Sequence, residues 1–412
     1  MRYRNDVTNG HVSGLVMSGG GARGAYEVGV LSFLLDELPR RLGRPLDFDI
    51  VTGTSVGAIH ACYVAATGGT TGAGARLVEI WRSLSVEGVY DLKVPDLVGL
   101  PLRMLGLGRS PGSEDDGRLT GLLDTRPLEK LVRETIPWNA LRRRLDEGAV
   151  EAVAVAATEI ASGKSVVWVD RPHGSLKGWA RDPFVVARET RLAPMHALAS
   201  AAIPFLFPAL RVDGGYYCDG GLRLNTPLSP ALRLGADRLL VIGLRHVPTP
   251  EEDAMLAAHR EGNYPTLTYL TGKVLNALLL DHVDYDVDRL VFMNAILETG
   301  IQTYGPEFLT RMNATIEGLR GNPYRVVQHV YLQPSRDLGM IASECVDHRP
   351  SGRGLQSWLA DSVVRYAVRG VSLEADLLSY LYFDRCFAEH LIDLGRADAE
   401  ARADELATLF AP

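Results

Sequence analysis

The strongest chemical signal in this sequence is a serine between two glycines, in the pentapeptide Gly53-Thr54-Ser55-Val56-Gly57. A strand-like run, residues 48–52 (FDIVT), precedes it, and a run of small residues with helical character, 56–66, follows it. G-x-S-x-G in this context is typical of a nucleophile elbow, in which the glycines permit a tight turn that lifts the serine above a sheet. We therefore predict that Ser55 is a nucleophile and that the Val56 amide faces the same space.

A glycine-rich loop, Gly19-Gly20-Gly21-Ala22-Arg23-Gly24, lies upstream between another strand-like run and a helical one. Its G-x-G-x-x-G pattern admits a dinucleotide-binding interpretation, but that fold places an acidic residue at the end of the second strand. Asp47 and Asp49 lie at the start of that strand instead. The alternative is that backbone amides at the helix N-terminus stabilise an oxyanion, with Arg23 holding the turn or adding positive potential.

The serine needs a base, and two kinds of residue are candidates. A triad would continue Ser…Asp…His, but His60 is one helical turn after the elbow and is expected to pack there. The other histidines considered lie in no motif, and we interpret each as a surface or core residue: His246, His282, His329, His348 and His390. Asp219, in Asp219-Gly220-Gly221, is the alternative. Asp-Gly is also a common turn, and an ordinary carboxylate with a pKa of about 3.9 is a weak base unless burial raises that pKa.

The elements that must position these residues alternate between strand and helix. Apolar strand-like runs occupy 12–18, 48–52, 150–157, 165–169, 238–243 and 326–332. Helical spacing covers 25–38, where Pro39 is expected to end the helix, and 56–66. Strands separated by helices predict an α/β fold with a mainly parallel sheet covered on both faces.

Composition excludes several classes of protein. The 412 residues carry 43 Lys and Arg against 50 Asp and Glu, a net charge of −7, which argues against a dedicated nucleic-acid binder. The four cysteines form no CxxC pair, so we expect no disulfide scaffold and no metal site, and we interpret Cys62 and Cys218 as small buried hydrophobes. The N-terminus has no signal-like apolar region, and glycines or prolines interrupt the uncharged windows 50–75 and 192–210. We expect a cytoplasmic protein without a transmembrane segment.

Four stretches carry a resemblance to a known family. Residues 19–31 (GGGARGAYEVGVL), 53–58 (GTSVGA), 199–208 (ASAAIPFLFP) and 219–221 (DGG) resemble the patatin-like phospholipases in order and context. Further stretches resemble bacterial members: 122–132, 157–168 and 274–290, with 333–339 as a weaker addition. The resemblance implies a three-layer α/β/α sandwich with C-terminal helices. We divide the chain into a catalytic domain (12–244), a continuation of the same core (245–345) and a helical tail without an assigned role (346–412).

The resemblance also implies a mechanism. By family role, Ser55 attacks the acyl ester carbonyl, and Asp219 accepts its proton and later activates water. The loop Gly19–Gly24 would supply oxyanion-hole amides. Plant patatins carry an Asp directly before the glycines, where this chain has Ser18, as many bacterial members do. Phospholipids and neutral lipids are the implied substrates, with no cofactor or calcium.

Two segments are candidates for contact with lipid. The proline-broken stretch 199–208 brings Phe205 and Phe207 close to the Asp motif, and the apolar excursion 92–108 has the character of a lid. The alternative interpretation is that both segments only pack in the hydrophobic core. The run Arg142–Arg144 could meet anionic headgroups at a membrane surface, although such a run is more often a solvated helix face.

Three other functions stay open at this stage. A nucleotide-binding oxidoreductase would use the glycine loop but would leave GTSVG and DGG unexplained. A non-catalytic acyl-lipid-binding scaffold would not need both Ser55 and Asp219. A conventional Ser-His-Asp esterase would need one of the scattered histidines.

Overall fold

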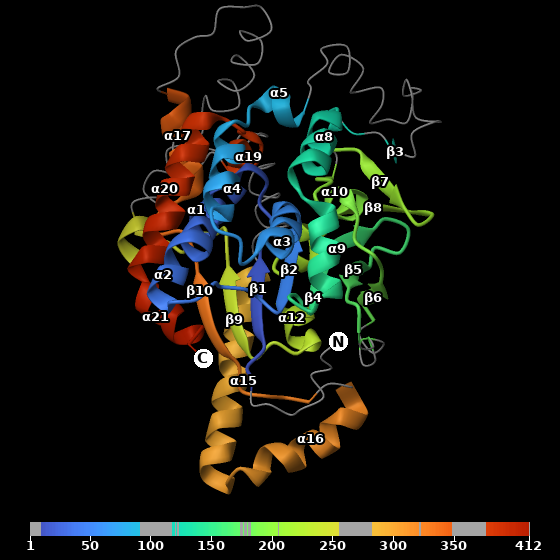
Figure 1. Ribbon diagram of the computed structural model, residues 1–412, viewed down its shortest axis with the longest axis vertical. Coiled ribbons are helices and arrows are strands. Elements are labelled where there is room, and N and C mark those ends of the chain that lie inside the picture. Colours follow the sequence, from blue (N-terminus) through green and yellow to red (C-terminus); the bar gives the residue numbers. More distant parts are fainter. Residues whose placement is uncertain are drawn as a thin grey trace, which may run out of the picture.

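A large twisted sheet between two layers of helices forms the body of the protein (Figure 1). The computed structural model describes residues 10–90, 118–119, 121, 123–173, 176, 179, 183–204, 206–254, 282–320, 323–347 and 376–411. The strands in these ranges are β1 (Ser13–Met17), β2 (Ile50–Thr54), β3 (Arg118–Leu119), β4 (Ala152–Glu159), β5 (Ser165–Asp170), β6 (Val185–Glu189), β7 (Ala209–Val212), β8 (Gly215–Asp219), β9 (Arg238–Ile242) and β10 (Gln328–Leu332).

The sheet has a parallel half and a mixed half that meet at β4. Strand order is β10-β9-β1-β2-β4-β8-β7-β3, with β5 also paired to β4 and β6 paired to β5. From β10 to β4 every neighbouring pair is parallel. Beyond β4, the β4–β5, β4–β8, β7–β8 and β3–β7 pairs are antiparallel, whereas β5 and β6 pair in parallel. The predicted α/β class with a mainly parallel sheet is therefore confirmed.

Helices cover both faces of the sheet. On the face with the larger core lie helices from the first 150 residues and from the C-terminus: α1 (Gly24–Ser32), the π-helical turn η2 (Phe33–Glu37), α2 (Leu38–Leu42), α3 (Val56–Thr67), α4 (Ala73–Arg82), α5 (Val86–Val89), α8 (Arg126–Thr135), α9 (Trp138–Asp146), α17 (Leu338–Asp347), α19 (Asp376–Leu381), α20 (Arg385–Ala401) and α21 (Ala403–Leu409). α11 (Gly221–Leu224) and α12 (Leu228–Leu234) cover the other face. α10 (Pro194–Ser200) packs against β4, β7 and β8.

The strand sequences explain this layering. In β1, Leu15 and Met17 point into the larger core, whereas Val16 points into the core beneath α12. In β4, Val153 and Val155 face the first core, and alanines at the intervening positions face the second. Successive side chains of a strand point to opposite faces, so a strand that is apolar throughout fills two cores.

Two details of the expected elements were wrong. The first helix does not end at Pro39, because the π turn η2 precedes it and Pro39 falls in the first turn of α2, where a missing amide costs nothing. The helix ends at Gly43, in the left-handed conformation. The second strand begins at Ile50 rather than at residue 48. The short strands β6, β7 and β8 were not predicted.

The C-terminal helices pack on the first helices of the chain. α20 lies along α1, and the two backbones approach each other at a glycine on each helix. A Cβ on Gly29 would lie 2.1 Å from the carbonyl oxygen of Ile392, and one on Gly395 would lie 2.1 Å from that of Tyr26. Cys345 on α17 and Cys386 on α20 form a disulfide. The sequence analysis, which expected no disulfide scaffold, did not predict this bond, because only folding brings together residues 41 positions apart.

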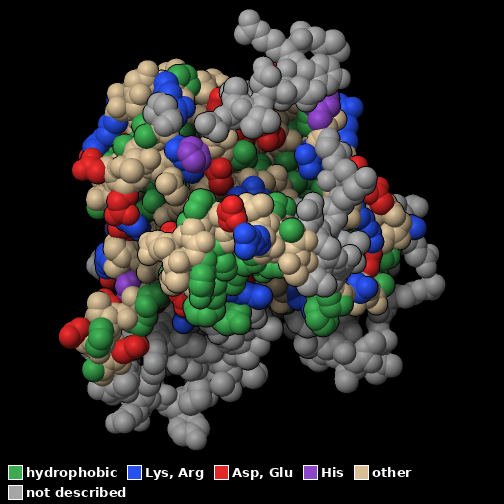
Figure 2. Space-filling model, turned by 90° about the horizontal axis from the view of Figure 1, so that it is seen from below, with side chains coloured by type: hydrophobic (Ala, Val, Ile, Leu, Met, Phe, Trp, Pro, Cys, Tyr) green, Lys and Arg blue, Asp and Glu red, His purple; other side chains and the backbone are tan. Residues whose placement is uncertain are grey.

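Two further helices, α15 (His282–Tyr304) and α16 (Glu307–Arg320), extend beyond the end of the sheet (Figure 1). α15 exposes Tyr285, Val291, Phe292, Ile296 and Tyr304, and the view from this end shows hydrophobic side chains gathered on the surface (Figure 2). Among the described residues, no helix combines the length and apolar character that crossing a membrane requires. The excursion at residues 92–108 lies outside the described residues.

Candidate active site

Ser55 occupies the sharp turn between β2 and α3. Its φ of 55° is unusual for a residue with a side chain, and such strain is characteristic of a nucleophile elbow. The two elbow glycines are required by close packing. A Cβ on Gly53 would lie 2.0 Å from the carbonyl oxygen of Gly57, and a Cβ on Gly57 would lie 2.6 Å from that of Met17. The predicted strand, turn and helix are all present around Ser55.

The sheet register brings Asp219 beside Ser55. β2 pairs with β4 up to Thr54 opposite Ala156. β5 pairs with one edge of β4, so β2 and β8 share the opposite edge. β8 begins to pair where β2 ends, and Asp219 lies opposite Ala157. Asp219 therefore lies one register position beyond the end of β2, where the chain turns through Ser55. The Asp219 amide donates to the Ala202 carbonyl oxygen at 2.8 Å, which fixes the end of the strand.

Ser55 and Asp219 are joined by a hydrogen bond. Ser55 Oγ donates to Asp219 Oδ2 at 2.6 Å, and the Gly221 amide donates to Asp219 Oδ1 at 2.7 Å. Asp219 is 1% exposed, and this burial raises its pKa to about 6, against the opposing effect of the two hydrogen bonds. A carboxylate with that pKa is a stronger base than an ordinary one, and it is still ionised at neutral pH. Gly220 has no space for a side chain, because its Cβ would lie 2.3 Å from the Ala156 carbonyl oxygen.

The glycine loop lies against the elbow. Ser18 and Gly19 are fixed by their own amides, which donate to Glu27 Oε1 at 2.9 Å and to Asn225 Oδ1 at 3.0 Å. The amides of Gly20 and Gly21 donate to no other group in the part of the chain that the structure describes. Ala22 and Arg23 continue Gly21 as a 3-10 turn, and Gly24 opens α1. The amides available to a substrate are therefore those of Gly20, Gly21 and Val56, whereas Gly19 is already engaged.

An apolar cavity of about 60 Å³, partly open to the surface, lies beside Ser55. Gly21, Ser55 and Val56 form one end. The remaining lining is almost entirely hydrophobic and comes mainly from α3, α4, α8 and the segment after α10, with Phe383 from the C-terminal region; it includes Ile59, Leu77, Ile80, Leu131, Ile203 and Phe207. Phe207 thus has the position expected for a cavity wall, whereas Phe205 lies outside the described residues. The hydrophobic lining of this cavity suits an apolar group.

A buried Glu27–His60–Trp81 chain connects the cavity wall to the glycine loop. The Trp81 indole N–H donates to His60 Nε2 at 3.1 Å, so the proton of the neutral ring is on Nδ1, which lies 2.7 Å from Glu27 Oε2. Glu27 also accepts the Ser18 amide, and its burial raises its pKa. His60 therefore has both ring nitrogens occupied and cannot accept the Ser55 proton.

No other described histidine contacts Ser55. His246 is bound to Pro334 and Glu252, and His390 contacts Cys386, far from the elbow in the chain. The side chains of His282 and His348 lie outside the described residues. The described geometry gives no support to a Ser-His-Asp triad, since the hydrogen-bond partner of Ser55 Oγ is Asp219.

Two supporting residues were missed by the sequence reasoning. Ser200 Oγ accepts the Ser55 amide at 2.8 Å and donates to the Ala156 carbonyl oxygen at 2.5 Å, so it ties the elbow to β4. Asn225 fixes Gly19 with its side chain and its carbonyl oxygen. Ser200 lies within the 199–208 stretch and Asn225 follows the Asp motif, but an isolated polar residue gives no sign of which amide it will bind.

Two other expectations have structural outcomes. Among the described residues, the one group of three side chains suited to a metal ion is Cys345, Cys386 and His390, and its two sulfurs are bonded to each other.

In the Arg142–Arg144 run, Arg142 pairs with Asp170 at 2.8 Å, and Arg144 pairs with Asp47 at 2.6 Å. These two arginines therefore stabilise the fold, and the run does not form a free basic patch.

Comparison with known proteins decides the family. The model for patatin-like phospholipases matches residues 15–232, which is more than half of the chain. The chain belongs to the patatin-like phospholipase family. The matched range of this patatin-like chain contains the glycine loop, the elbow and the Asp motif, so the family resemblance seen in the sequence is confirmed.

Two curated relatives of this patatin-like chain are each named cGAMP-activated phospholipase. One, from Pseudomonas aeruginosa (strain BWHPSA011 / Pa011), is 28% identical over 250 residues, which cover 59% of this chain and 59% of the relative. The other, from Vibrio cholerae serotype O1, is 28% identical over 224 residues, which cover 52% of this chain and 54% of the relative. The match therefore spans less than two thirds of either relative.

Among solved structures, human GIVD cytosolic phospholipase A2 in complex with methyl gamma-linolenyl fluorophosphonate matches 97% of this chain and 58% of its own, at 13% identity and a TM-score of 0.39. VipD from Legionella pneumophila matches 93% of this chain and 67% of its own, at 13% identity and a TM-score of 0.31. At these scores neither likeness carries an argument about this protein.

Proposed function

We propose that this protein is a serine lipid acyl hydrolase that cleaves acyl ester bonds through a Ser55–Asp219 dyad. The observation that carries the proposal is the 2.6 Å hydrogen bond from Ser55 Oγ to the buried Asp219 carboxylate, beside an apolar cavity. The family match supports lipid ester hydrolysis as the class of reaction.

The acylation step follows from the positions of these groups. Asp219 Oδ2 accepts the Ser55 proton while Ser55 Oγ attacks the ester carbonyl carbon. The amides of Gly20, Gly21 and Val56 stabilise the oxyanion that forms, because they are positioned before the reaction and need no reorganisation. Collapse of the tetrahedral intermediate returns the proton to the departing alcohol oxygen and leaves an acyl-Ser55 ester.

Deacylation uses the same carboxylate. Asp219, again ionised, takes a proton from water, whose oxygen attacks the acyl-Ser55 carbonyl. The fatty acid leaves and Ser55 regains its proton. No metal or redox group takes part in this scheme.

The cavity selects the acyl part of the substrate. Each methylene that moves from water into an apolar site contributes about 0.8 kcal/mol, so the hydrophobic wall favours long-chain esters over short ones. Phospholipids and neutral lipids share this acyl group, and both are candidate substrates. The chemistry takes place at the cavity end formed by Gly21, Ser55 and Val56.

A regulator is proposed from the relatives alone. Both curated relatives are named for activation by cGAMP. We extend this to the present chain, so that hydrolysis is expected to increase when cGAMP is added. An assay without the nucleotide would then underestimate the activity.

The test is hydrolysis of p-nitrophenyl acyl esters and phospholipid vesicles, each with and without cGAMP. Wild type is expected to release acid, whereas Ser55→Ala and Asp219→Asn are expected to lose at least about a thousandfold in kcat. Ser83→Ala and Asp213→Asn repeat the same chemical changes at exposed positions and should keep wild-type activity. A folded wild type that is inactive under every condition would favour a non-catalytic acyl-lipid-binding scaffold, and an active Asp219→Asn would return the base to a histidine.

A further inference from the structure

A segment of the C-terminal region, residues 378–386, runs from the glycine loop to the disulfide; we call it the C-terminal strap. It comprises the end of α19, the turn 382–384 and the first residues of α20. Its buried side chains include Ser379, Tyr380 and Phe383. The strap lies far from the glycine loop in sequence but contacts it in the folded protein.

The strap contacts the glycine loop directly. Arg23, which is 4% exposed, donates from Nε to Ser379 Oγ at 2.8 Å, and its guanidinium carbon lies 4.4 Å from the centre of the Tyr380 ring. A Cβ on Gly21 would lie 2.3 Å from the Tyr380 carbonyl oxygen, so the strap backbone presses against the loop. The loop that offers its amides to the substrate is therefore supported from behind by the strap.

The strap also forms part of the cavity wall. Phe383 lines the cavity that begins at Ser55 and lies 6.2 Å, centre to centre, from the Trp81 ring. Asp384 caps α20, because its carboxylate accepts the Cys386 amide at 2.8 Å. The C-terminal strap thus contacts the glycine loop, contributes to the cavity wall and contains the disulfide cysteine Cys386.

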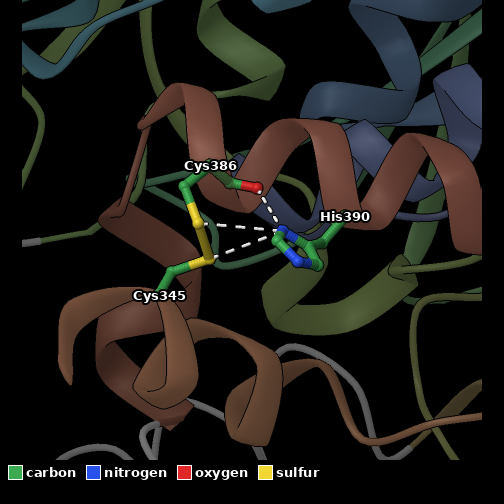
Figure 3. A group of neighbouring side chains, drawn as sticks. All are labelled: Cys345, Cys386 and His390. Atoms are coloured by element: carbon green, nitrogen blue, oxygen red, sulfur yellow. Dashed lines mark hydrogen bonds between the residues drawn. A yellow bond between two sulfur atoms is a disulfide. The ribbon is translucent and has the colours of Figure 1, made fainter. Parts of the chain in front are cut away.

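The disulfide links α17, which packs against the strap, to α20. Cys345 lies near the end of α17, which packs against both α19 and α20, and its bond to Cys386 ties α17 to the first turn of α20 (Figure 3). Reduction removes the covalent link between α17 and α20. Any displacement of α17 removes support from α19, and through it from Arg23 and Gly21.

The surroundings of the disulfide suit reaction with thiols. Cys345 is buried, Cys386 is half-buried and His390 is exposed. His390 Nδ1 lies 3.7 Å from each sulfur and 2.8 Å from the Cys386 carbonyl oxygen (Figure 3). An imidazole beside a sulfur stabilises the thiolate and can return a proton to it, which favours exchange at this position.

We propose that Cys345–Cys386 is a thiol-exchange site that switches the hydrolase through the C-terminal strap, with the oxidised form active. This proposal rests on the proposed function for its effect on activity. The co-reactant is a dithiol. One of its thiolates attacks Cys386 Sγ, the sulfur–sulfur bond breaks, and its electron pair leaves on Cys345 Sγ, which takes a proton. The second thiol of the reagent attacks the mixed disulfide, Cys386 leaves as a thiolate and is protonated, and the dithiol becomes a disulfide.

The experiment uses the full chain purified without reductant, compared before and after dithiothreitol and after reoxidation. Thiol titration of the denatured protein should find two thiols, Cys62 and Cys218, before reduction and four after it. The kcat of ester hydrolysis should fall by about tenfold on reduction and recover on reoxidation. This decrease is smaller than the 10²–10³-fold decrease in kcat that follows complete loss of one oxyanion donor. Amide hydrogen exchange should become faster in the strap and in the glycine loop.

Variants separate the switch from general destabilisation. Cys345→Ser and Cys386→Ser should show the reduced-state kcat and no response to dithiothreitol. Ser379→Ala, which removes the acceptor of the Arg23 Nε–H, should lower kcat with an intact disulfide. His390→Gln should slow reduction of the disulfide. If Cys345→Ser does not fold, the reversible reduction of wild type still decides the matter.

Four results would overturn the proposal. They are thiols that never pair under oxidation, a kcat equal within about twofold in both redox states, unchanged exchange in the strap, and one equivalent of Zn²⁺ held by the reduced protein in place of a disulfide. Absence of hydrolysis in both states would instead refute the proposed function, and the thiol and exchange measurements would still decide whether the strap responds to the disulfide.

Discussion

Replacing Asp219 with Asn should abolish hydrolysis and make the folded protein more stable at neutral pH. The buried carboxyl group has a pKa of about 6 against an ordinary value of 3.8, so the folded state holds its proton more tightly than the unfolded state does. Ionisation therefore costs the folded state about 3 kcal/mol, because each pH unit between the two pKa values corresponds to about 1.36 kcal/mol. Asn removes this cost and keeps the shape of the side chain.

The sign of this effect depends on pH. Below pH 3.8 the group is protonated in both states, and the variant should have no advantage from this source. As pH rises through about 6 the wild type loses stability relative to the variant, and the full difference is present above that pH. An amide cannot reproduce both accepted hydrogen bonds, so 3 kcal/mol is an upper value. For a chain of this length it corresponds to about 3 °C in Tm.

The assay is thermal unfolding of wild type and Asp219→Asn from pH 4 to pH 8, together with ester hydrolysis. Asp213→Asn is the matched control: Asp213 is exposed on the β7–β8 turn and has a positive φ that Asn tolerates well, so its Tm should follow wild type at every pH. A variant less stable than wild type at pH 8, or a difference that does not grow between pH 4 and pH 7, would refute the assignment of Asp219 as a buried base of raised pKa.

Three further outcomes follow from the same structure. Ser200→Ala removes the acceptor of the buried Ser55 amide and should lower kcat by about tenfold and stability by about 1–3 kcal/mol, measured by ester kinetics and chemical denaturation. Ile80→Trp should shorten the preferred acyl chain, with a change of about fourfold in kcat/KM per methylene excluded, whereas Val78→Trp, also on α4 but outside the cavity lining, should leave the chain-length profile unchanged. Cys345→Ser removes the disulfide, which joins residues 41 positions apart, and should lower the free energy of unfolding by up to about 4 kcal/mol, or Tm by about 5 °C. An unchanged Tm would contradict a stabilising role for the disulfide.

The parts of the site that are local in sequence could be predicted. Gly53 and Gly57 around Ser55 encode a sharp turn between a strand and a helix, and the apolar runs at β1, β4, β5 and β9 are long enough to be recognised as buried strands. The family match to residues 15–232 agrees with the motifs from which the resemblance was drawn.

The parts that depend on distant contacts could not be predicted. Asp219 was a candidate from its Asp-Gly motif, but its raised pKa comes from burial beside β4, which no local pattern encodes. Ser200 is one small polar residue in an alanine-rich helix. The pairing of Cys345 with Cys386 depends on how α17 packs on α20, because their spacing matches no known motif. The strap at 378–386 was likewise seen only as part of a helical tail.

The most direct test of the dyad is labelling with an alkyl fluorophosphonate followed by peptide mass spectrometry. The account predicts that the probe phosphonylates Ser55, that the labelling rate rises with pH through a single ionisation near pH 6, and that Asp219→Asn labels at least about a hundredfold more slowly. A label on another residue, or a rate that Asp219→Asn leaves unchanged, would contradict it.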